Sequence, residues 1–224
     1  MGNPSALAGI MVASVKQTMP DCPVWQLTDR DTQEIPGVDK VVRLDLPKLG
    51  MAKIYEAAIV PAGVMLFRMR LLSTLDKEPT ITIDTDCIVQ KDLSHVFDDD
   101  FDIALTYRDA PVIDPLGNNV AEHMPFNTGV MFCRNPQVWK DCLFEMQQMD
   151  MDLKTWYGDQ LAIKHVSRSY KTKRLSCDPY NYTPLNKNED VSDKQVVHYK
   201  GVRKAWMIER YSSQAHADSL ARPL

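Results

Sequence analysis

The sequence lacks three features that mark membrane, secreted and dithiol proteins. No apolar run is long enough to span a bilayer, and the apolar segment Ala6–Ala13 has no basic residue before it, as a signal peptide would. The five cysteines include no C-x-x-C pair, and several lie inside apolar segments, which predicts buried, reduced thiols. We therefore expect a cytoplasmic protein without a transmembrane segment.

An excess of basic residues is also absent. The chain has 26 Lys and Arg against 30 Asp and Glu, for a net charge of −4, which argues against a general nucleic-acid binder but leaves room for a local basic site. A hydrophobic content of 44% and a charged content of 25% are ordinary for a globular protein. The 224 residues predict one domain over 1–224, with about 205–224 as a C-terminal tail.

The most informative stretch is Thr80–Val89, an apolar, β-branched run that contains Asp84 and Asp86. Residues 80–83 are typical of a buried, central strand. Ligands of open α/β sheets lie beyond the carboxyl ends of strands, where the two aspartates fall. If both carboxylates lie on one side of the chain, they suit a divalent cation that also holds phosphates. The ordinary alternative is a turn, because Asp is common where strands end.

Helix and strand patterns alternate along the chain, which predicts an α/β fold. Helices are expected at 4–19 with Asn3 as N-cap, at 51–59 and 62–75 with an interruption near Pro61, at 92–97, after Asn135–Pro136, and at 161–166. Strands are expected at 24–28, 40–44, 80–83, 101–107, 128–133, 175–177 and 196–198. An α/β nucleotide-binding domain normally begins with a strand, so the first strand is expected to be absent or to come from residues outside this sequence. The segment 108–125 is expected to be a flap or an acceptor-side loop.

The C-terminal stretch His198–Trp206 offers a second set of polar groups. His198 follows an expected strand, Gly201 allows a tight turn, and Lys204 comes shortly after it. A neutral imidazole can complete a divalent metal shell, and a lysine can contact phosphate. An isolated histidine is more often structural than a ligand, but the upstream D-x-D makes the combination informative. Elsewhere, Arg68 has an ordinary interpretation as part of a solvated helix face, and Asp159 as a helix cap.

With these motifs in this order, the sequence resembles the family 8 glycosyltransferases, retaining enzymes of the type A glycosyltransferase fold that include glycogenin and bacterial galactosyltransferases. The family motif H-x-x-G-x-x-K-P-W matches residues 198–206, except that Ala205 replaces the proline. Four other positions agree: Arg68 sixteen residues before the D-x-D, the D-x-D itself, Asn127 in F-N-T-G-V-M, and Asp159–Gln160 in G-D-Q. The resemblance covers residues 68–206. It implies a single Rossmann-like nucleotide-sugar-binding domain with a mixed central sheet.

The resemblance also implies a role for each matching residue. Asp84, Asp86 and His198 would hold Mn²⁺ or Mg²⁺, which bridges the diphosphate of a nucleotide sugar. Asp159 and Gln160 would be catalytic, with Gln160 near the anomeric carbon. The donor site would consist of Arg68, Asp84, Asn127, Gly201 and Lys204. The implied reaction moves a hexose, from UDP-glucose or UDP-galactose, to an unknown acceptor with retention of configuration.

Two other functions stay open at this point. The family's first strand and the loop after it help to bind the nucleotide base, and neither is evident here, so a nucleotide-sugar-binding protein without turnover is one alternative. A phosphatase of the haloacid-dehalogenase type also begins with D-x-D after a strand. That motif requires Thr or Val four residues after the first aspartate, where this chain has Ile88, and it has no use for H-x-x-G-x-x-K.

Overall fold

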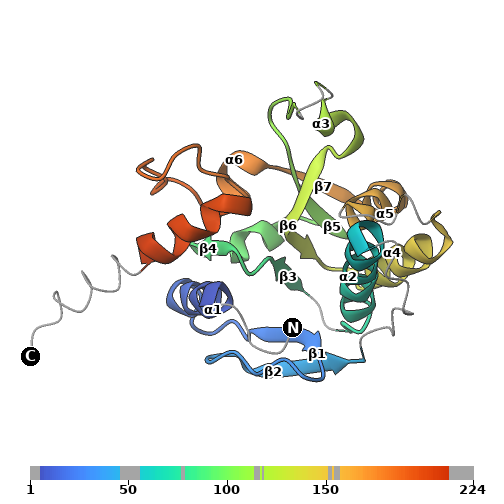
Figure 1. Cartoon of the computed structure of the whole chain (residues 1–224), viewed down its shortest axis with the longest axis horizontal. Helices are drawn as coiled ribbons and strands as arrows, with labels where there is room; N and C mark the ends of the chain where they lie inside the picture. The colour runs from blue at the N-terminus through green and yellow to red at the C-terminus, as the bar shows by residue number, and fades with distance from the viewer. Residues whose placement is uncertain are drawn as a thin grey trace, which may run out of the picture.

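The computed structural model of the chain (Figure 1) describes residues 6–45, 56–76, 79–113, 117, 119–150, 153 and 157–211. The expected N-cap at Asn3 and the start of the expected helix at 51–59 lie outside the described residues. The first described element is the helix α1 (Ala6–Thr18), as the sequence predicts.

The centre of the molecule is a mixed sheet, which confirms the expected architecture. β6 (Phe126–Cys133) pairs antiparallel with β3 (Thr80–Ile83) on one side and with β5 (Ile103–Tyr107) on the other, and β7 (Thr172–Ser176) pairs parallel with β5. In the described part of the chain β3 is an edge strand of this sheet, so the prediction of a central strand is wrong. Its four residues are half-buried, and β-branched residues suit any half-buried pleated surface.

Two smaller sheets flank the central one. β1 (Trp25–Asp29) pairs parallel with β2 (Lys40–Leu44), close to the predicted ranges. β4 (Cys87–Val89) pairs antiparallel with β8 (Val196–His198). The second pair joins the residues after the D-x-D to the start of the C-terminal motif.

Helices cover the sheet from both sides, and some differ from prediction. α2 (Glu56–Leu72) runs through Pro61 without interruption, because one missing N–H early in the helix removes a single bond while the following turns pack on the sheet. The helix expected at 92–97 is a 3₁₀ turn, η2 (Ser94–Asp98). The remaining helical elements are α3 (Val120–His123), α4 (Gln137–Gln148), α5 (Gly158–Val166), η3 (Ser167–Ser169), α6 (Cys177–Tyr180), η4 (Gly201–Arg203) and a helix over 204–211. None of the helices described here combines the length and hydropathy needed to cross a bilayer.

The expected strand 175–177 is displaced toward the N-terminus. β7 ends at Ser176, whose side chain accepts a hydrogen bond from the Asp178 N–H and so caps α6. Cys177 therefore begins a helix rather than ending a strand. All five cysteines are free thiols, but Cys22 and Cys177 are only half-buried, so the prediction of burial is wrong for these two.

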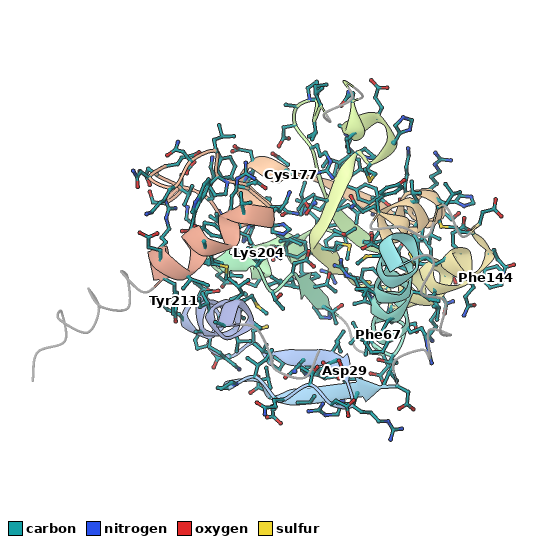
Figure 2. All side chains as sticks on the ribbon, in the orientation of Figure 1. Asp29, Phe67, Phe144, Cys177, Lys204 and Tyr211 are labelled. Atoms are coloured by element: carbon teal, nitrogen blue, oxygen red, sulfur yellow. The ribbon has the colours of Figure 1, made fainter. Side chains whose placement is uncertain are left out.

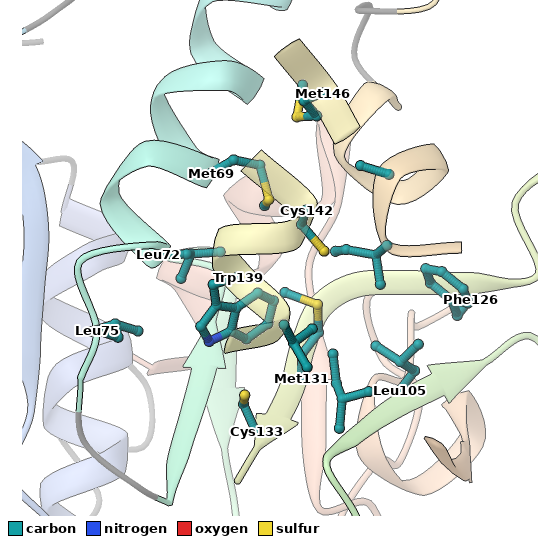
Figure 3. Packing of buried hydrophobic residues seen from close by; sticks show 14 of the residues in the cluster. Met69, Leu72, Leu75, Leu105, Phe126, Met131, Cys133, Trp139, Cys142 and Met146 are labelled. Carbon is teal, nitrogen blue, oxygen red and sulfur yellow. The ribbon is translucent and has the colours of Figure 1, made fainter. Parts of the chain in front are cut away.

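Two apolar clusters pack on opposite faces of the central sheet. Met131 and Cys133 of β6 belong to the cluster beneath α2, α4 and α5, whereas Val130 and Phe132 belong to the cluster that includes residues of α1 and β4. This division follows from the period-2 alternation of side chains along a strand. Trp139 of α4 is fully buried in the first cluster, beside Met131 (Figure 3). Each face of the central sheet is thus covered by an apolar layer.

Candidate active site

The D-x-D segment and the C-terminal histidine motif meet because their backbones pair. In the β4–β8 ladder Cys87 lies opposite His198, and the Tyr199 N–H donates to the Asp86 carbonyl oxygen at 2.8 Å. Residues far apart in the sequence are therefore held side by side by main-chain hydrogen bonds. The ladder fixes the separation of the Asp86 carboxylate and the His198 ring.

Asn181 orients the ring of His198. The Asn181 Oδ1 lies 2.8 Å from His198 Nδ1, and both side chains are buried. The Asn181 amide nitrogen donates to Thr106 Oγ1, and to the main-chain and side-chain oxygens of Asn127, at 2.8–3.2 Å. These three acceptors fix which end of the amide is the oxygen, so Nδ1 of His198 is the donor toward Asn181. In the neutral ring, the lone pair on Nε2 is then available to a ligand.

That Nε2 atom faces two carboxylates. It lies 3.0 Å from Asp86 Oδ1 and 3.9 Å from Asp84 Oδ2. A nitrogen lone pair and a carboxylate oxygen repel at such distances unless a proton or a metal cation lies between them. Two carboxylates and one imidazole are also ligands that Mn²⁺ and Mg²⁺ sites can use. The donor atoms therefore fit a divalent cation.

Asp86 is held in its charged form. Lys204 Nζ lies 3.3 Å from Asp86 Oδ2, at the point where the C-terminal segment passes β4 (Figure 2). Burial raises the pKa of Asp86, but in the metal-free site the hydrogen bond and charge of a His198 ring protonated at Nε2, together with the charge of Lys204, outweigh it, so this pKa lies below its usual range. The carboxylate is therefore ionised at neutral pH, as a metal ligand must be.

Cys87 competes with Asp84 as the third ligand. The ligand atoms of Asp86, Cys87 and His198 all lie within 4.8 Å of one another. The Cys87 thiol is fully buried, and its burial, with the charges of Asp84 and Asp86, raises its pKa well above the usual range. The Cys87 side chain packs in the apolar cluster, and Mn²⁺ and Mg²⁺ prefer oxygen ligands to sulfur, so the chemistry of the donor set favours the Asp84 carboxylate as the third ligand.

Arg68 of α2 bridges two carboxylates. Its Nη2 lies 3.0 Å from Asp84 Oδ1 and its Nη1 lies 3.1 Å from Asp159 Oδ2. Burial lowers the pKa of Arg68, but the charges of Asp84 and Asp159 raise it above the usual value. The side chain is only 23% exposed, so the interpretation as a solvated helix face is wrong for Arg68. The guanidinium connects the D-x-D to the G-D-Q motif.

Asp159 lies in the first turn of α5 with a side chain that is 1% exposed. Its Oδ1 accepts from the Gln160 N–H at 2.8 Å, and its Oδ2 accepts from Thr128 Oγ1 at 3.2 Å. Burial raises its pKa above the usual range, although the charge of Arg68 opposes the shift. The N-cap of α5 is Tyr157, so the interpretation of Asp159 as a helix cap is wrong.

Gln160 contacts a further arginine, and Gly201 forms the turn before Lys204. The Gln160 side-chain oxygen accepts from Arg108 Nη2 at 3.3 Å, and Arg108 Nε donates to the Met124 carbonyl oxygen at 2.9 Å. Gly201 has a φ of +59° at the start of η4, a conformation that favours glycine. This turn leads from β8 to Lys204.

Gly129 of β6 leaves room for the histidine ring. A Cβ at position 129 would lie 2.3 Å from His198 Cε1 and 2.4 Å from His198 Nδ1. Asn127 Oδ1 accepts from the Gly129 N–H at 3.0 Å, and also from Asn181. Asn127 therefore belongs to the network that orients His198, while the Asp84 N–H donates to the Gly129 carbonyl oxygen at 2.8 Å. A single strand residue thus contacts both halves of the candidate metal site.

The structure brings the predicted residues into one region. Ion pairs link Arg68, Asp84, Asp86, Asp159, His198 and Lys204, and hydrogen bonds connect Asn127 and Gln160 to their neighbours. Their roles in donor binding and catalysis stay predictions. Sequence reasoning missed Asn181, Gly129 and Arg108. A glycine inside a strand is itself a signal of close approach, whereas Asn181 and Arg108 had no distinguishing signal.

No family model matches the chain, and no curated protein sequence matches it significantly. Solved structures do resemble it. The galactosyltransferase LgtC, in complex with donor and acceptor sugar analogues, is 15% identical, with 96% of this chain and 93% of that chain covered and a TM-score of 0.55. A glycosyltransferase involved in glycosylation of the major capsid of PBCV-1 is 15% identical, with 86% and 100% covered and a TM-score of 0.54.

The glycosyltransferase GlyE of Streptococcus pneumoniae TIGR4 is 14% identical, with a TM-score of 0.52. The match covers 99% of this chain but 64% of that one. At these identities the likeness establishes the fold, and the expected type A glycosyltransferase fold is thereby confirmed.

Proposed function

We propose that the protein is a retaining, metal-dependent glycosyltransferase that moves a hexose from a UDP sugar, such as UDP-glucose or UDP-galactose, to an acceptor. The observation that carries this proposal is the Nε2 atom of His198, which faces the carboxylates of Asp84 and Asp86 while Nδ1 of the same ring contacts the Asn181 side-chain oxygen. Asp84 and Asp86 follow β3, and His198 ends β8, on a fold shared with glycosyltransferases. Such strand ends are where α/β proteins bind ligands.

Mn²⁺ or Mg²⁺ fits the site, with Asp84, Asp86 and His198 as the residues that would hold it. When bound, the ion would supply positive charge to the diphosphate leaving group. Two further residues would support such an ion, because Asn181 holds the ring of His198 and Arg68 holds the Asp84 carboxylate.

The chain's own cations serve the same chemistry. Breaking a sugar–phosphate bond leaves negative charge on the diphosphate, and preorganised positive groups stabilise it without a proton transfer. Lys204 is 49% exposed and lies beside Asp86, so its ammonium can reach a diphosphate held over the D-x-D. Arg68 is held in place by two carboxylates, and it faces the donor sugar in this proposal.

Retention requires attack from the leaving-group face or a carboxylate nucleophile. Asp159 is the carboxylate of the G-D-Q motif, but both of its oxygens accept hydrogen bonds and its side chain is almost fully buried. A buried, engaged carboxylate is a poor nucleophile, so Asp159 positions Arg68 and the start of α5. These contacts favour attack from the leaving-group face, with Gln160 near the anomeric carbon.

Calorimetric titration of UDP, with Mn²⁺ and again with EDTA, tests the proposal. We expect a dissociation constant on the order of micromolar that is lost with EDTA and in Asp86→Asn and His198→Ala. Asp100→Asn is the matched control, because this exposed carboxylate pairs with Lys171 away from the site. Binding that EDTA and both site variants leave unchanged would refute the metal assignment.

Hydrolysis of UDP-glucose or UDP-galactose with Mn²⁺ tests turnover. Product with retained anomeric configuration, detected by NMR, supports the transferase. Metal-dependent UDP binding without sugar release from any UDP sugar would instead indicate a nucleotide-sugar-binding protein.

A further inference from the structure

Arg108, the residue after β5, is fixed by the segment that enters β6. Its main-chain N–H donates to the Pro125 carbonyl oxygen at 2.8 Å, and its Nε donates to the Met124 carbonyl oxygen at 2.9 Å. The side chain is half-buried, and a planar guanidinium held in this way has a defined direction. The remaining nitrogens of Arg108 therefore point to a fixed place.

The outer end of this guanidinium faces the side chain of Gln160. Arg108 Nη2 donates to Gln160 Oε1 at 3.3 Å, and the charge of the donor strengthens the bond. A guanidinium carries only donors, so the amide atom that faces it is the oxygen. The amide nitrogen diverges from that oxygen and has no hydrogen-bond acceptor among the described residues. The side chain thus presents free N–H groups on the side away from Arg108.

The main chain of Gln160 places this amide beside the candidate site. Its N–H donates to Asp159 Oδ1 at 2.8 Å, and the other oxygen of Asp159 pairs with Arg68 at 3.1 Å. Arg68 in turn contacts the Asp84 carboxylate at 3.0 Å. The Gln160 side chain therefore extends from the first turn of α5, one residue from the carboxylate that connects this turn to the D-x-D.

We propose that Arg108 is a positioning residue, which holds Gln160 so that its amide nitrogen, rather than its amide oxygen, faces the donor sugar. This inference rests on the proposed function, which puts Gln160 near the anomeric carbon. The amide nitrogen then donates a hydrogen bond to an oxygen of the donor. The amide oxygen, which a nucleophilic role at the anomeric carbon would require, stays against the positive charge of Arg108. No bond forms between Gln160 and the sugar, in agreement with attack from the leaving-group face.

Gln160→Glu separates the two orientations of this side chain, because a carboxylate only accepts hydrogen bonds. The new carboxylate pairs with Arg108 and offers no N–H to the sugar, so kcat for hydrolysis of UDP-glucose or UDP-galactose should fall about tenfold or more. Mass spectrometry should detect no hexosyl group on the variant. A native kcat, or a hexosyl group bound at position 160, would overturn the inference, because either result requires an oxygen that faces the sugar.

Arg108→Met tests the positioning itself, because it removes the donors and keeps an unbranched side chain. We expect kcat to fall about tenfold while the dissociation constant of UDP stays unchanged, and Arg108→Lys should retain part of the activity. Arg174→Met is the matched control, because Arg174 lies over the ring of Tyr107 on the neighbouring strand β7, and it should keep the native kcat.

A double-mutant cycle excludes a merely structural role for Arg108. In a Gln160→Ala background, Arg108→Met should change kcat no further, because the side chain that it positions is gone. An equal loss of kcat in the native and Gln160→Ala backgrounds would overturn the inference. If a UDP sugar binds but no sugar is released, the affinity of UDP-glucose relative to UDP is measured instead. This ratio should fall about tenfold in Gln160→Glu and in Arg108→Met, and an unchanged ratio would overturn the inference.

Failure of the proposed function has a different signature. Absence of metal-dependent UDP binding to the native protein would overturn the proposed function, and this inference with it. Metal-dependent UDP binding and sugar release that neither Gln160→Glu nor Arg108→Met alters would overturn this inference alone.

Discussion

Gly129→Ala is the sharpest test of the metal-site geometry, because it adds one methyl group at a known place. The new Cβ would lie 2.3 Å from His198 Cε1 and 2.8 Å from Asn127 Oδ1. Carbon atoms pack at about 3.5 Å or more, so the ring must retreat by about 1 Å or the strand must move. Beside Gly129 the strand is bonded to the Asp84 N–H, but its pairing with β5 shifts register between Asn127 and Met131, so movement of the ring or of this strand segment disturbs the candidate metal site.

A displacement of this size breaks the 2.8 Å contact of His198 Nδ1 with Asn181 and moves Nε2 away from the carboxylates. Overpacking of this kind costs about 1–3 kcal/mol of unfolding free energy. Loss of an outer-shell partner typically lowers metal affinity by about 10–100-fold. We expect both effects, with Mn²⁺ affinity measured by electron paramagnetic resonance and stability measured by urea unfolding.

Two further variants make the test specific. Gly9→Ala is the matched control, because a Cβ at Gly9 of α1 meets nothing within 4 Å, and it should raise stability by about 0.5–1 kcal/mol. In a His198→Ala background, Gly129→Ala should cost less than in the native chain, which a double-mutant cycle measures. If Gly129→Ala binds Mn²⁺ and resists urea as the native protein does, residue 129 does not confine the ring and the reasoning is wrong.

Three other predictions follow from single contacts. Asn181→Ala should lower Mn²⁺ affinity about tenfold with the ligands intact, and unchanged resonance-detected affinity would remove its orienting role. In Arg68→Lys the single ammonium cannot bridge two carboxylates, and the charge of buried Asp159 is then poorly compensated. Urea unfolding should show a free energy of unfolding lower by about 2–3 kcal/mol, and a value equal to that of the native protein would contradict this. Trp139→Ala should cost about 3–5 kcal/mol, whereas Phe144→Ala on the same helix, 63% exposed, should stay within about 0.5 kcal/mol; similar losses for both would refute the core assignment.

Local patterns predict the elements of this fold better than their positions in the sheet. The β-branched run of β3 correctly predicts a strand, but a strand's place depends on which neighbours reach its edges, and those neighbours are distant in the sequence. Pro61 fails as a helix breaker for the same reason, because packing of the following turns decides the outcome. The sequence also does not predict the three-residue strand β4 as a separate element, because only its pairing with β8 defines it.

The candidate site likewise contains residues that the sequence predicts and residues that only the fold reveals. Asp84, Asp86 and His198 are evident from motifs, because each is a chemically distinctive residue after an expected strand. Arg68 and Arg70 show the limit, since both stand in one apolar helix, where a solvated face is the ordinary interpretation of an arginine. Only the fold places the carboxylates of Asp84 and Asp159 in contact with Arg68.

The protonation pattern of the histidine is set by a residue that no motif marks. A sequence identifies His198 as a possible ligand but leaves its two ring nitrogens equivalent. Asn181 removes the equivalence, because its own amide is oriented by Thr106 and Asn127 and presents only an oxygen to Nδ1. Asn181 stands in a polar segment whose composition also fits a solvated loop, so its role depends on a fold that places it beneath the ring. The free Nε2 lone pair, on which the metal assignment depends, is therefore a product of tertiary structure rather than of the D-x-D or histidine motifs.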